Sequence, residues 1–164
     1  MTDRRLRLSF VIATLALLAA CGSKPPEPAK MRAQIVAAPT LNPDRRGASK
    51  PVVVRIYQLK TPGAFEAADF FSLYNDASAV LAADLLATQE LMLQPGERQA
   101  LEAEFDPATR VIGVLAAFRD IENAQWRTSV ALPEEKLIKF FDKRQMLVDL
   151  NDRTVTLRFD KPPK

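Results

Sequence analysis

The stretch Arg110-Val111-Ile112-Gly113-Val114-Leu115-Ala116-Ala117-Phe118 decides the fold of this chain. Side chains alternate between the two faces of a strand, and here both alternating sets are apolar after Arg110. Such a run predicts a central strand that is buried on both faces. The polar segment Asp120–Ala124 then turns the chain, and Trp126–Leu132 is predicted to return as the neighbouring strand.

Two later segments alternate strictly between apolar and polar side chains. In Thr154–Phe159, Val155, Leu157 and Phe159 share one face, and Gln145–Leu150 has the same pattern. Asn151-Asp152 lies between these two runs and is a pair typical of tight turns. We therefore predict an antiparallel hairpin here.

A second hairpin is predicted around Pro95-Gly96. Leu91 and Leu93 alternate with Glu90, Met92 and Gln94 before this turn, and Leu101, Ala103 and Phe105 alternate with Ala100, Glu102 and Glu104 after it. Proline followed by glycine favours a tight turn. We expect the two runs to pair with each other.

The remaining strands lie near the start of the domain. Pro51–Leu59 contains three consecutive valines and is predicted to be a strand, whereas Arg32–Ala38 is a weaker candidate. In total, about eight strands are spaced by turn residues. This pattern favours a mainly β, two-sheet β-sandwich over an alternating α/β fold.

The stretch Thr61–Leu86 has a different composition, rich in aromatic residues and alanine. We predict one or two short helices, inserted between strands and lying over the sandwich, with Asp76 capping a helix through Ala77–Leu81. Core packing explains the aromatic residues better than a ligand pocket does. Leu137–Phe141 is compatible with either a strand edge or a single helical turn.

The first twenty residues have the pattern of a secretory signal peptide. Arg4, Arg5 and Arg7 form a basic start, and Leu8–Ala20 is almost entirely apolar. A membrane-spanning helix needs about 20 apolar residues, so this run is too short to span comfortably. We therefore assign residues 1–20 to a signal peptide that is excluded from the fold.

Leu18-Ala19-Ala20-Cys21 resembles the bacterial lipobox, in which the cysteine thiol receives a diacylglycerol. We predict that Cys21 carries this lipid and an N-acyl chain, and that no other cofactor is bound. Two or more acyl chains suffice for stable membrane anchoring. The alternative is a plain signal peptide cut after Ala20, which would leave Cys21 as a free thiol.

Residues 21–30 are predicted to form a flexible tether, because three prolines, a glycine and a serine cannot build a core. The sandwich domain is then expected over residues 31–164. Residue 22 is glycine and not aspartate, which favours sorting to the outer membrane, with the domain on its periplasmic face.

Composition argues against catalysis and against nucleic acid. Without residues 1–20, the chain has 20 basic and 19 acidic side chains, a balance that gives no reason to expect nucleic-acid binding. The chain has no histidine, and lipidation would occupy its only thiol, so His-based and Cys-based chemistry is excluded. A carboxylate pair remains conceivable, but Glu102 and Glu104 are expected on a solvated strand face. We predict that the protein is not an enzyme and has no metal site.

Several stretches, in order along the chain, resemble the TssJ (SciN/VasD) family of type VI secretion lipoproteins. They are Leu41-Asn42-Pro43-Asp44 with Pro51–Leu59, Phe65–Phe70 with Leu73, Leu91–Glu97, and Ile112–Asp120 with Trp126-Arg127. The resemblance covers nearly the whole chain after the lipobox and weakens over Pro133–Arg144.

This resemblance implies a transthyretin-like β-sandwich with added helices, held at the outer membrane. It further implies that the protein recruits the periplasmic C-terminal domain of the inner-membrane protein TssM, with TssL in the wider membrane complex. In the family, the loop between the first two strands contacts the partner, and here this loop is Thr40–Lys50. The implied partner-binding residues are Leu41, Asn42, Pro43, Asp44, Arg45, Arg46, Gly47, Ala48, Ser49 and Lys50.

The chemistry of this loop suits protein binding. It is longer than the two to five residues usual in hairpins, and three prolines in and beside it restrict its backbone. Asp44, Arg45, Arg46 and Lys50 give it a net charge of +2, and arginine can fork onto a partner's carboxylates. On chemistry alone, a solvated mobile loop is an equal alternative.

The alternative function is a periplasmic β-sandwich lipoprotein that binds a small ligand or cell-wall glycan. Such a protein would need an exposed aromatic platform. The only tryptophan is Trp126, which lies in a strand predicted to be mostly core.

Overall fold

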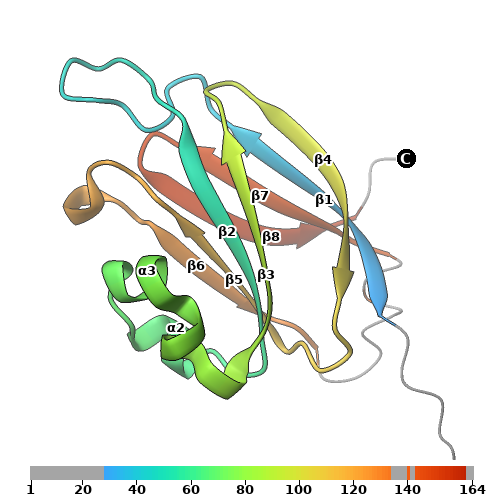
Figure 1. The fold of residues 1–164 in the computed structure, drawn as a ribbon. Helices are drawn as coiled ribbons and strands as arrows, with labels where there is room; N and C mark the ends of the chain where they lie inside the picture. Colours follow the sequence, from blue (N-terminus) through green and yellow to red (C-terminus); the bar gives the residue numbers. More distant parts are fainter. Residues whose placement is uncertain (1–27, 134–139, 141–142, 162–164) are drawn as a thin grey trace, which may run out of the picture.

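The computed structural model describes residues 28–133, 140 and 143–161, which fold into eight strands with two helices and two 3₁₀ turns (Figure 1). In chain order these are β1 (Ala29–Ala37), β2 (Val52–Leu59), α2 (Gly63–Ala67), α3 (Phe70–Leu81), η2 (Ala82–Asp84), β3 (Leu85–Leu93), β4 (Arg98–Phe105), β5 (Val111–Ala116), η3 (Ile121–Asn123), β6 (Arg127–Ala131), β7 (Gln145–Asn151) and β8 (Thr154–Asp160).

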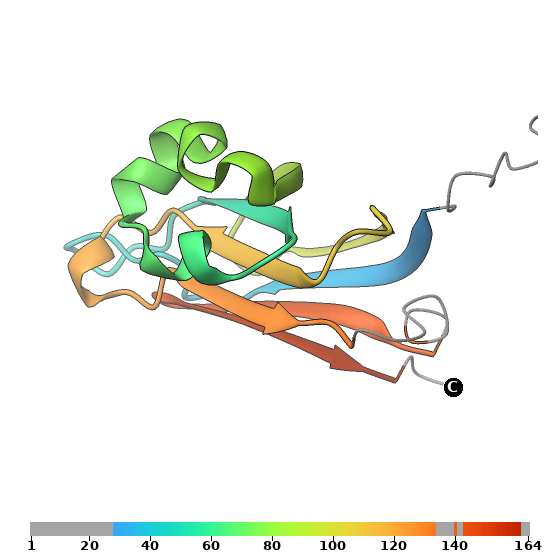
Figure 2. The ribbon, with the colours of Figure 1, turned by 90° about the horizontal axis from the view of Figure 1, so that it is seen from below.

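The strands form two four-stranded sheets, in the orders β4-β1-β7-β8 and β3-β2-β5-β6. The two sheets lie face to face, and the helices cover the outer face of the second sheet (Figure 2). The predicted mainly β, two-sheet sandwich is therefore confirmed. Neighbouring strands are antiparallel, except that β1 and β7 run parallel.

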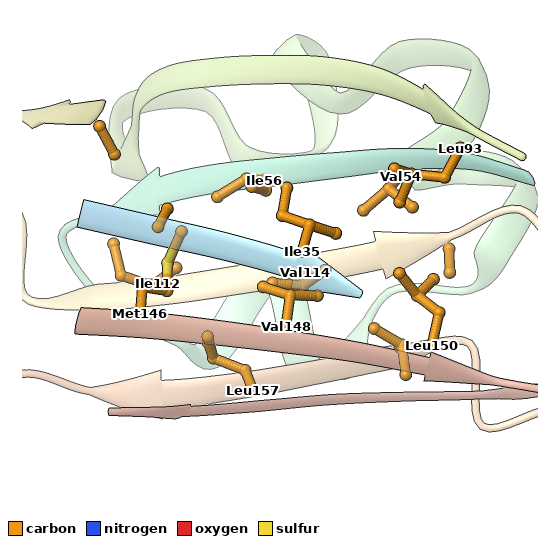
Figure 3. Packing of buried hydrophobic residues seen from close by; sticks show 14 of the residues in the cluster. Ile35, Val54, Ile56, Leu93, Ile112, Val114, Met146, Val148, Leu150 and Leu157 are labelled. Carbon is orange, nitrogen blue, oxygen red and sulfur yellow. The ribbon is translucent and has the colours of Figure 1, made fainter. Parts of the chain in front are cut away.

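Aliphatic side chains from both sheets fill the space between them (Figure 3). Ile35 and Val148 enter from the first sheet, and Val54 and Val114 enter from the second, each with 0% of its surface exposed. Burying one such side chain stabilises the fold by about 1.5–3 kcal/mol. The alternation seen in the sequence therefore reports which face of each strand meets this core.

Strand β5 is central and buried at all six positions, as predicted. It lies between β2 and β6. Ile112 and Val114 face the other sheet, whereas Val111 and Leu115 belong to a second core beneath the helices. The partner strand predicted over Trp126–Leu132 is also confirmed, as β6.

The predicted helical insertion over the sandwich is confirmed. Tyr57 of β2 packs against Phe65 of α2, with ring centroids 5.6 Å apart, and Phe65 is fully buried. Gly113 of β5 makes room for this ring, because a Cβ built there would lie 2.9 Å from it. Phe65 and Phe70 thus belong to a second core, as the sequence favours, whereas Phe71 is exposed.

Asp76 caps a helix, as predicted, but inside α3. Its backbone leaves the helical region (φ −148°, ψ 69°), and its Oδ1 accepts a hydrogen bond from the Ala79 N–H at 3.0 Å. Asp69, which the prediction did not include, caps the start of α3 by accepting from the Ser72 N–H at 3.0 Å. Strand β3 begins at Leu85, so the helical insertion is shorter than predicted.

The C-terminal hairpin of β7 and β8 is confirmed. Its turn, however, is one residue later than predicted. Asn151 still pairs with Thr154, so the two turn residues are Asp152 and Arg153. Asp152 supplies the positive φ (29°) in this turn.

The predicted hairpin of β3 with β4 is wrong, because the two strands lie in different sheets. Gly96 does turn the chain, with φ 78°, but its N–H donates to the Ala38 carbonyl at 3.1 Å. The Ala37 N–H donates to Glu97 at 2.9 Å. The turn therefore attaches to the end of β1, and β4 pairs with β1 instead of β3.

The first strand is longer than predicted. It begins at Ala29 and not at Arg32, so Ala29 and Lys30, which the sequence assigns to the tether, are strand residues. Cys21 lies outside the described residues, as does Leu137–Phe141 apart from Phe140. None of the described helices is long and apolar enough to cross a membrane.

A composite loop site at one end of the sandwich

The loop predicted to bind a partner connects β1 to β2. Because these strands lie in different sheets, it is a crossover between sheets and not a hairpin loop. It projects from the end of the sandwich opposite to the start of β1 (Figure 1). A strand rises about 3.3 Å per residue, so the nine residues of β1 separate the two ends by about 30 Å.

The inner part of this loop is built into the protein. Leu41 is fully buried in the main core, and Asn42 is 3% exposed. The Asn42 side chain donates through Nδ2 to the Pro51 carbonyl at 2.6 Å and accepts at Oδ1 from the Arg119 N–H at 2.9 Å. Asn42 has a positive φ of 49°, a conformation that asparagine tolerates better than most residues.

Asp44 organises the outer part. Its Oδ1 accepts from the N–H groups of Arg46 and Ala48 at 2.9 and 3.0 Å, and its Oδ2 lies 3.3 Å from the Lys50 Nζ. Its N–H also donates to the Ala48 carbonyl at 2.9 Å. The two backbone donors, with a smaller contribution from Lys50, hold the pKa of the Asp44 carboxyl below its ordinary value. The tip therefore has a defined hydrogen-bonded shape.

The ten predicted contact residues fall into three groups. Arg45, Arg46, Gly47 and Ala48 are exposed at the tip. Half-buried residues flank the tip, namely Pro43, Asp44, Ser49 and Lys50. Leu41 and Asn42 are buried, so in this structure they support the loop and offer no surface to a partner.

Two further loops complete the site. Arg119 and Asp120 follow β5, and Arg153 lies in the β7–β8 turn, at the same end of the sandwich (Figures 1 and 2). With the β1–β2 loop they enclose an open hollow of about 640 Å³. It is lined by Pro43, Asp44, Arg45, Arg46, Arg119, Asp120 and Arg153, a set that we call the arginine hollow.

The three loops are bonded to one another. The Asn42 N–H donates to the Asp152 carbonyl at 2.6 Å, and the Asn42 side chain accepts from Arg119. The Arg153 Nε lies 3.2 Å from the Asp120 Oδ2, and the Gln125 N–H donates to the Arg153 carbonyl at 2.9 Å. These bonds hold the walls of the hollow in place before any ligand arrives.

Sequence reasoning did not include Arg119, Asp120 or Arg153 in the site. Two predicted features could have pointed to them. Arg119 and Asp120 directly follow the buried strand, and Arg153 is next to the predicted hairpin turn. These loops lie at the same end of the sandwich as Thr40–Lys50. That placement depends on the order of the strands in both sheets, which the sequence pattern does not give.

The features that would indicate a glycan-binding, catalytic or metal site are weaker in the described residues. Trp126 is half-buried, with the Phe70 ring 5.4 Å away edge-on and the Arg127 guanidinium 4.7 Å over its ring. Glu102 and Glu104 are exposed and paired with Lys30, at 3.4 and 2.9 Å. Within the described residues, no three or more histidine, cysteine, aspartate or glutamate side chains gather to hold a metal.

Comparison with known families gives a match over residues 29–158 to a family described as type VI secretion lipoprotein (VasD, EvfM, TssJ). This match defines the class of protein as a secretion-system lipoprotein domain. The chain belongs to this TssJ (SciN) family of type VI secretion lipoproteins. The family is a structural one and not a known enzyme family. A search of curated proteins gives no match.

Solved structures agree with this assignment. The chain is similar to the T6SS lipoprotein TssJ1 from Pseudomonas aeruginosa, with 32% identity, a TM-score of 0.74, and coverage of 83% of this chain and 99% of that one. It is similar to Serratia marcescens Lip, a membrane-bound component of the type VI secretion system, with 28% identity, a TM-score of 0.70, and coverage of 84% and 99%. It also matches a chain in a structure described as the T6SS protein TssM C-terminal domain (869–1107) from EAEC, with 28% identity, a TM-score of 0.59, and coverage of 79% and 97%.

Proposed function

We propose that this protein is a lipid-anchored docking subunit that holds the periplasmic C-terminal domain of TssM at the outer membrane. In this proposal Cys21 carries the diacylglycerol and the N-acyl chain, and TssM is bound in turn to TssL within the wider membrane complex. The protein performs no catalysis. Its role is to place one rigid protein surface at a fixed distance from a bilayer.

The observation that carries the proposal is the position of the organised loop. Its exposed tip, Arg45–Ala48, projects from the end of the sandwich opposite to Ala29. A chain from Cys21 to Ala29 spans at most about 28 Å when fully extended. Because β1 adds about 30 Å beyond Ala29, the tip can reach well beyond the tether, away from a membrane that holds Cys21. That direction suits a partner that approaches from the inner membrane.

The third structural match supports the choice of partner. The chain aligned there is almost fully covered by about four-fifths of this protein, so it is shorter than the range 869–1107 named in its description. We take the aligned chain to be a TssJ-like polypeptide that accompanies the TssM domain. The proposal extends that association to the present protein.

The loop is suited to binding because its shape is set in advance. The Asp44 carboxylate holds the backbone of Arg46 and Ala48, and the ordering of the loop is therefore already complete in the free protein. The exposed Arg45 and Arg46 side chains can each make two parallel hydrogen bonds to a carboxylate.

Two measurements test the proposal. Radiolabelled palmitate should enter the wild-type protein in living cells and should not enter Cys21→Ser, which should leave the membrane fraction while remaining folded. Deleting residues 44–48 should abolish capture of the TssM periplasmic domain while the rest of the domain stays folded, as judged by a cooperative urea unfolding transition. Normal capture of TssM by the deletion variant would show that the loop is not the docking site.

A further inference from the structure

We infer that the arginine hollow binds an acidic segment of the docking partner, and that Arg119 and Arg153 belong to the docking surface together with the β1–β2 loop. This inference rests on the proposed function for the identity of the partner. It adds the chemistry that the partner must present and two loops that the family resemblance does not assign.

The charge balance of the hollow is the first argument. It contains four arginines and two aspartates. Both carboxylates are already engaged within the protein. Asp44 accepts from two backbone N–H groups and forms an ion pair with Lys50, and Asp120 forms an ion pair with Arg153 and accepts from the Asn123 Nδ2 at 2.9 Å. Both negative charges of the hollow are therefore neutralised by contacts within the protein, and these contacts stabilise the loops that line the hollow.

Three of the four arginines, in contrast, have guanidinium groups without a partner among the described residues. Arg45, Arg46 and Arg119 are exposed, and among the described residues their guanidinium groups have no ion pair or hydrogen bond. Each guanidinium presents donors in a planar fork that matches a carboxylate. Three unpaired cations around one hollow therefore favour an anionic ligand with more than one carboxylate.

The shape and position of the hollow favour a protein over other anions. At about 640 Å³ it is open, so a small anion would stay hydrated there, whereas a protein surface that covers the hollow would exclude water and strengthen the ion pairs. An anionic membrane surface is disfavoured because the hollow lies at the end of the sandwich opposite to Ala29, from which the chain leads back to Cys21.

The test begins with the protein alone. The mature lipoprotein in zwitterionic micelles is titrated with hexaglutamate while the arginine Nε–H resonances are followed by NMR. The resonances of Arg45, Arg46 and Arg119 should shift, and that of Arg32, an exposed arginine on β1, should not. Hexaglutamine should shift none of them. Equal shifts at Arg32, or no shifts in the hollow, would overturn the inference.

Two competitors separate the sources of negative charge. Inorganic phosphate, and phosphatidylcholine vesicles containing phosphatidylglycerol, should each shift the hollow arginines less than hexaglutamate at the same concentration of charge. If phosphate is equally effective, the hollow is a small-anion site, and if the vesicles are more effective it is a lipid site. Either result contradicts binding of an acidic protein segment.

The second stage uses the TssM periplasmic domain. Arg45→Ala and Arg119→Ala should each weaken its binding about tenfold and flatten the salt dependence of Kd, because each removes a charge-assisted contact. Arg119→Lys should recover part of the loss, since it restores the charge without the fork, and Arg32→Ala should match wild type. If the wild-type protein fails to bind TssM, the proposed function fails, while the titration still decides the chemistry of the hollow.

Discussion

The side chain of Asn42 accepts a hydrogen bond from the backbone N–H of Arg119 at 2.9 Å, across 77 positions of the sequence. This bond joins the β1–β2 loop, which we propose as the docking site, to the loop after β5. Asn42 is nearly inaccessible and also bonds to Pro51 and Asp152. The sequence analysis placed Asn42 among the partner-binding residues, but in the structure it connects the two loops that form two walls of the arginine hollow.

Replacing Asn42 by alanine should destabilise the protein by about 2–4 kcal/mol, because it removes two part-buried hydrogen bonds to the backbone and places alanine at a positive φ. Urea unfolding measures the change. Asn75→Ala, at an exposed position of α3, should stay within about 0.5 kcal/mol of wild type. An equally small effect of Asn42→Ala would show that the hydrogen bonds of Asn42 contribute nothing to stability.

Adding a methyl group at Gly113 should disturb the helical layer. The new Cβ would meet the Phe65 ring at 2.9 Å, and forcing extra volume into a packed core costs about 1–3 kcal/mol. Gly63→Ala is the matched control, since nothing lies within 4 Å of its Cβ. Gly113→Ala combined with Phe65→Leu should lose less than the sum of the two single changes. Strict additivity in this double-mutant cycle would contradict the contact.

The tip of the β1–β2 loop should be resistant to moderate acid. The folded state lowers the pKa of Asp44 from its ordinary value of 3.8, chiefly through the N–H groups of Arg46 and Ala48. The stabilisation is therefore fully present above pH 3.8 and is lost as the pH falls through the lowered value. The amide signals of Arg46 and Ala48, followed by NMR, should move only below pH 3.8.

Asp44→Asn provides the control for this titration, because its amide oxygen can accept the same bonds without ionising. Its Arg46 and Ala48 signals should show no such acid transition. A wild-type transition above the ordinary pKa of an aspartate would contradict the bonding described for Asp44.

The two aspartate caps of α3 should each contribute measurably to stability. Asp69→Ala and Asp76→Ala should each cost about 1 kcal/mol, because each leaves a backbone donor at a helix start without its partner. Glu122→Ala, at an exposed position of η3, should be neutral in the same urea experiment. A neutral Asp76→Ala would indicate that the kink in α3 does not depend on this cap.

The sequence predicted most strands because burial has a period of two along a strand that is covered on one face, and Val155–Phe159 and Met146–Leu150 carry that period plainly. The burial pattern of a strand does not indicate which other strand pairs with it in the sheet. Leu93 and Phe105 both point into the core, yet they lie on different sheets. The choice is made by Ala37 and Ala38, whose backbone bonds to the Gln94–Glu97 turn leave no trace in the pattern of side chains.

The candidate site shows the same division. The family resemblance pointed to Thr40–Lys50, and its length, proline content and charge are compatible with binding, but none of these could distinguish Asn42, which is buried, from Arg45, which is exposed. Arg119 and Arg153 join the site only because β5 and the β7–β8 hairpin end beside that loop. Such long-range neighbours follow from the topology of both sheets, which no local pattern encodes.

The central claim is that the tip of the β1–β2 loop touches TssM in the cell, and site-specific photocrosslinking tests it most directly. A photoreactive amino acid at the exposed Ala48 should give a crosslink to TssM, and the same group at the exposed Thr156, on β8, should give none. A crosslink to TssM from position 156 but not from position 48 would contradict the account.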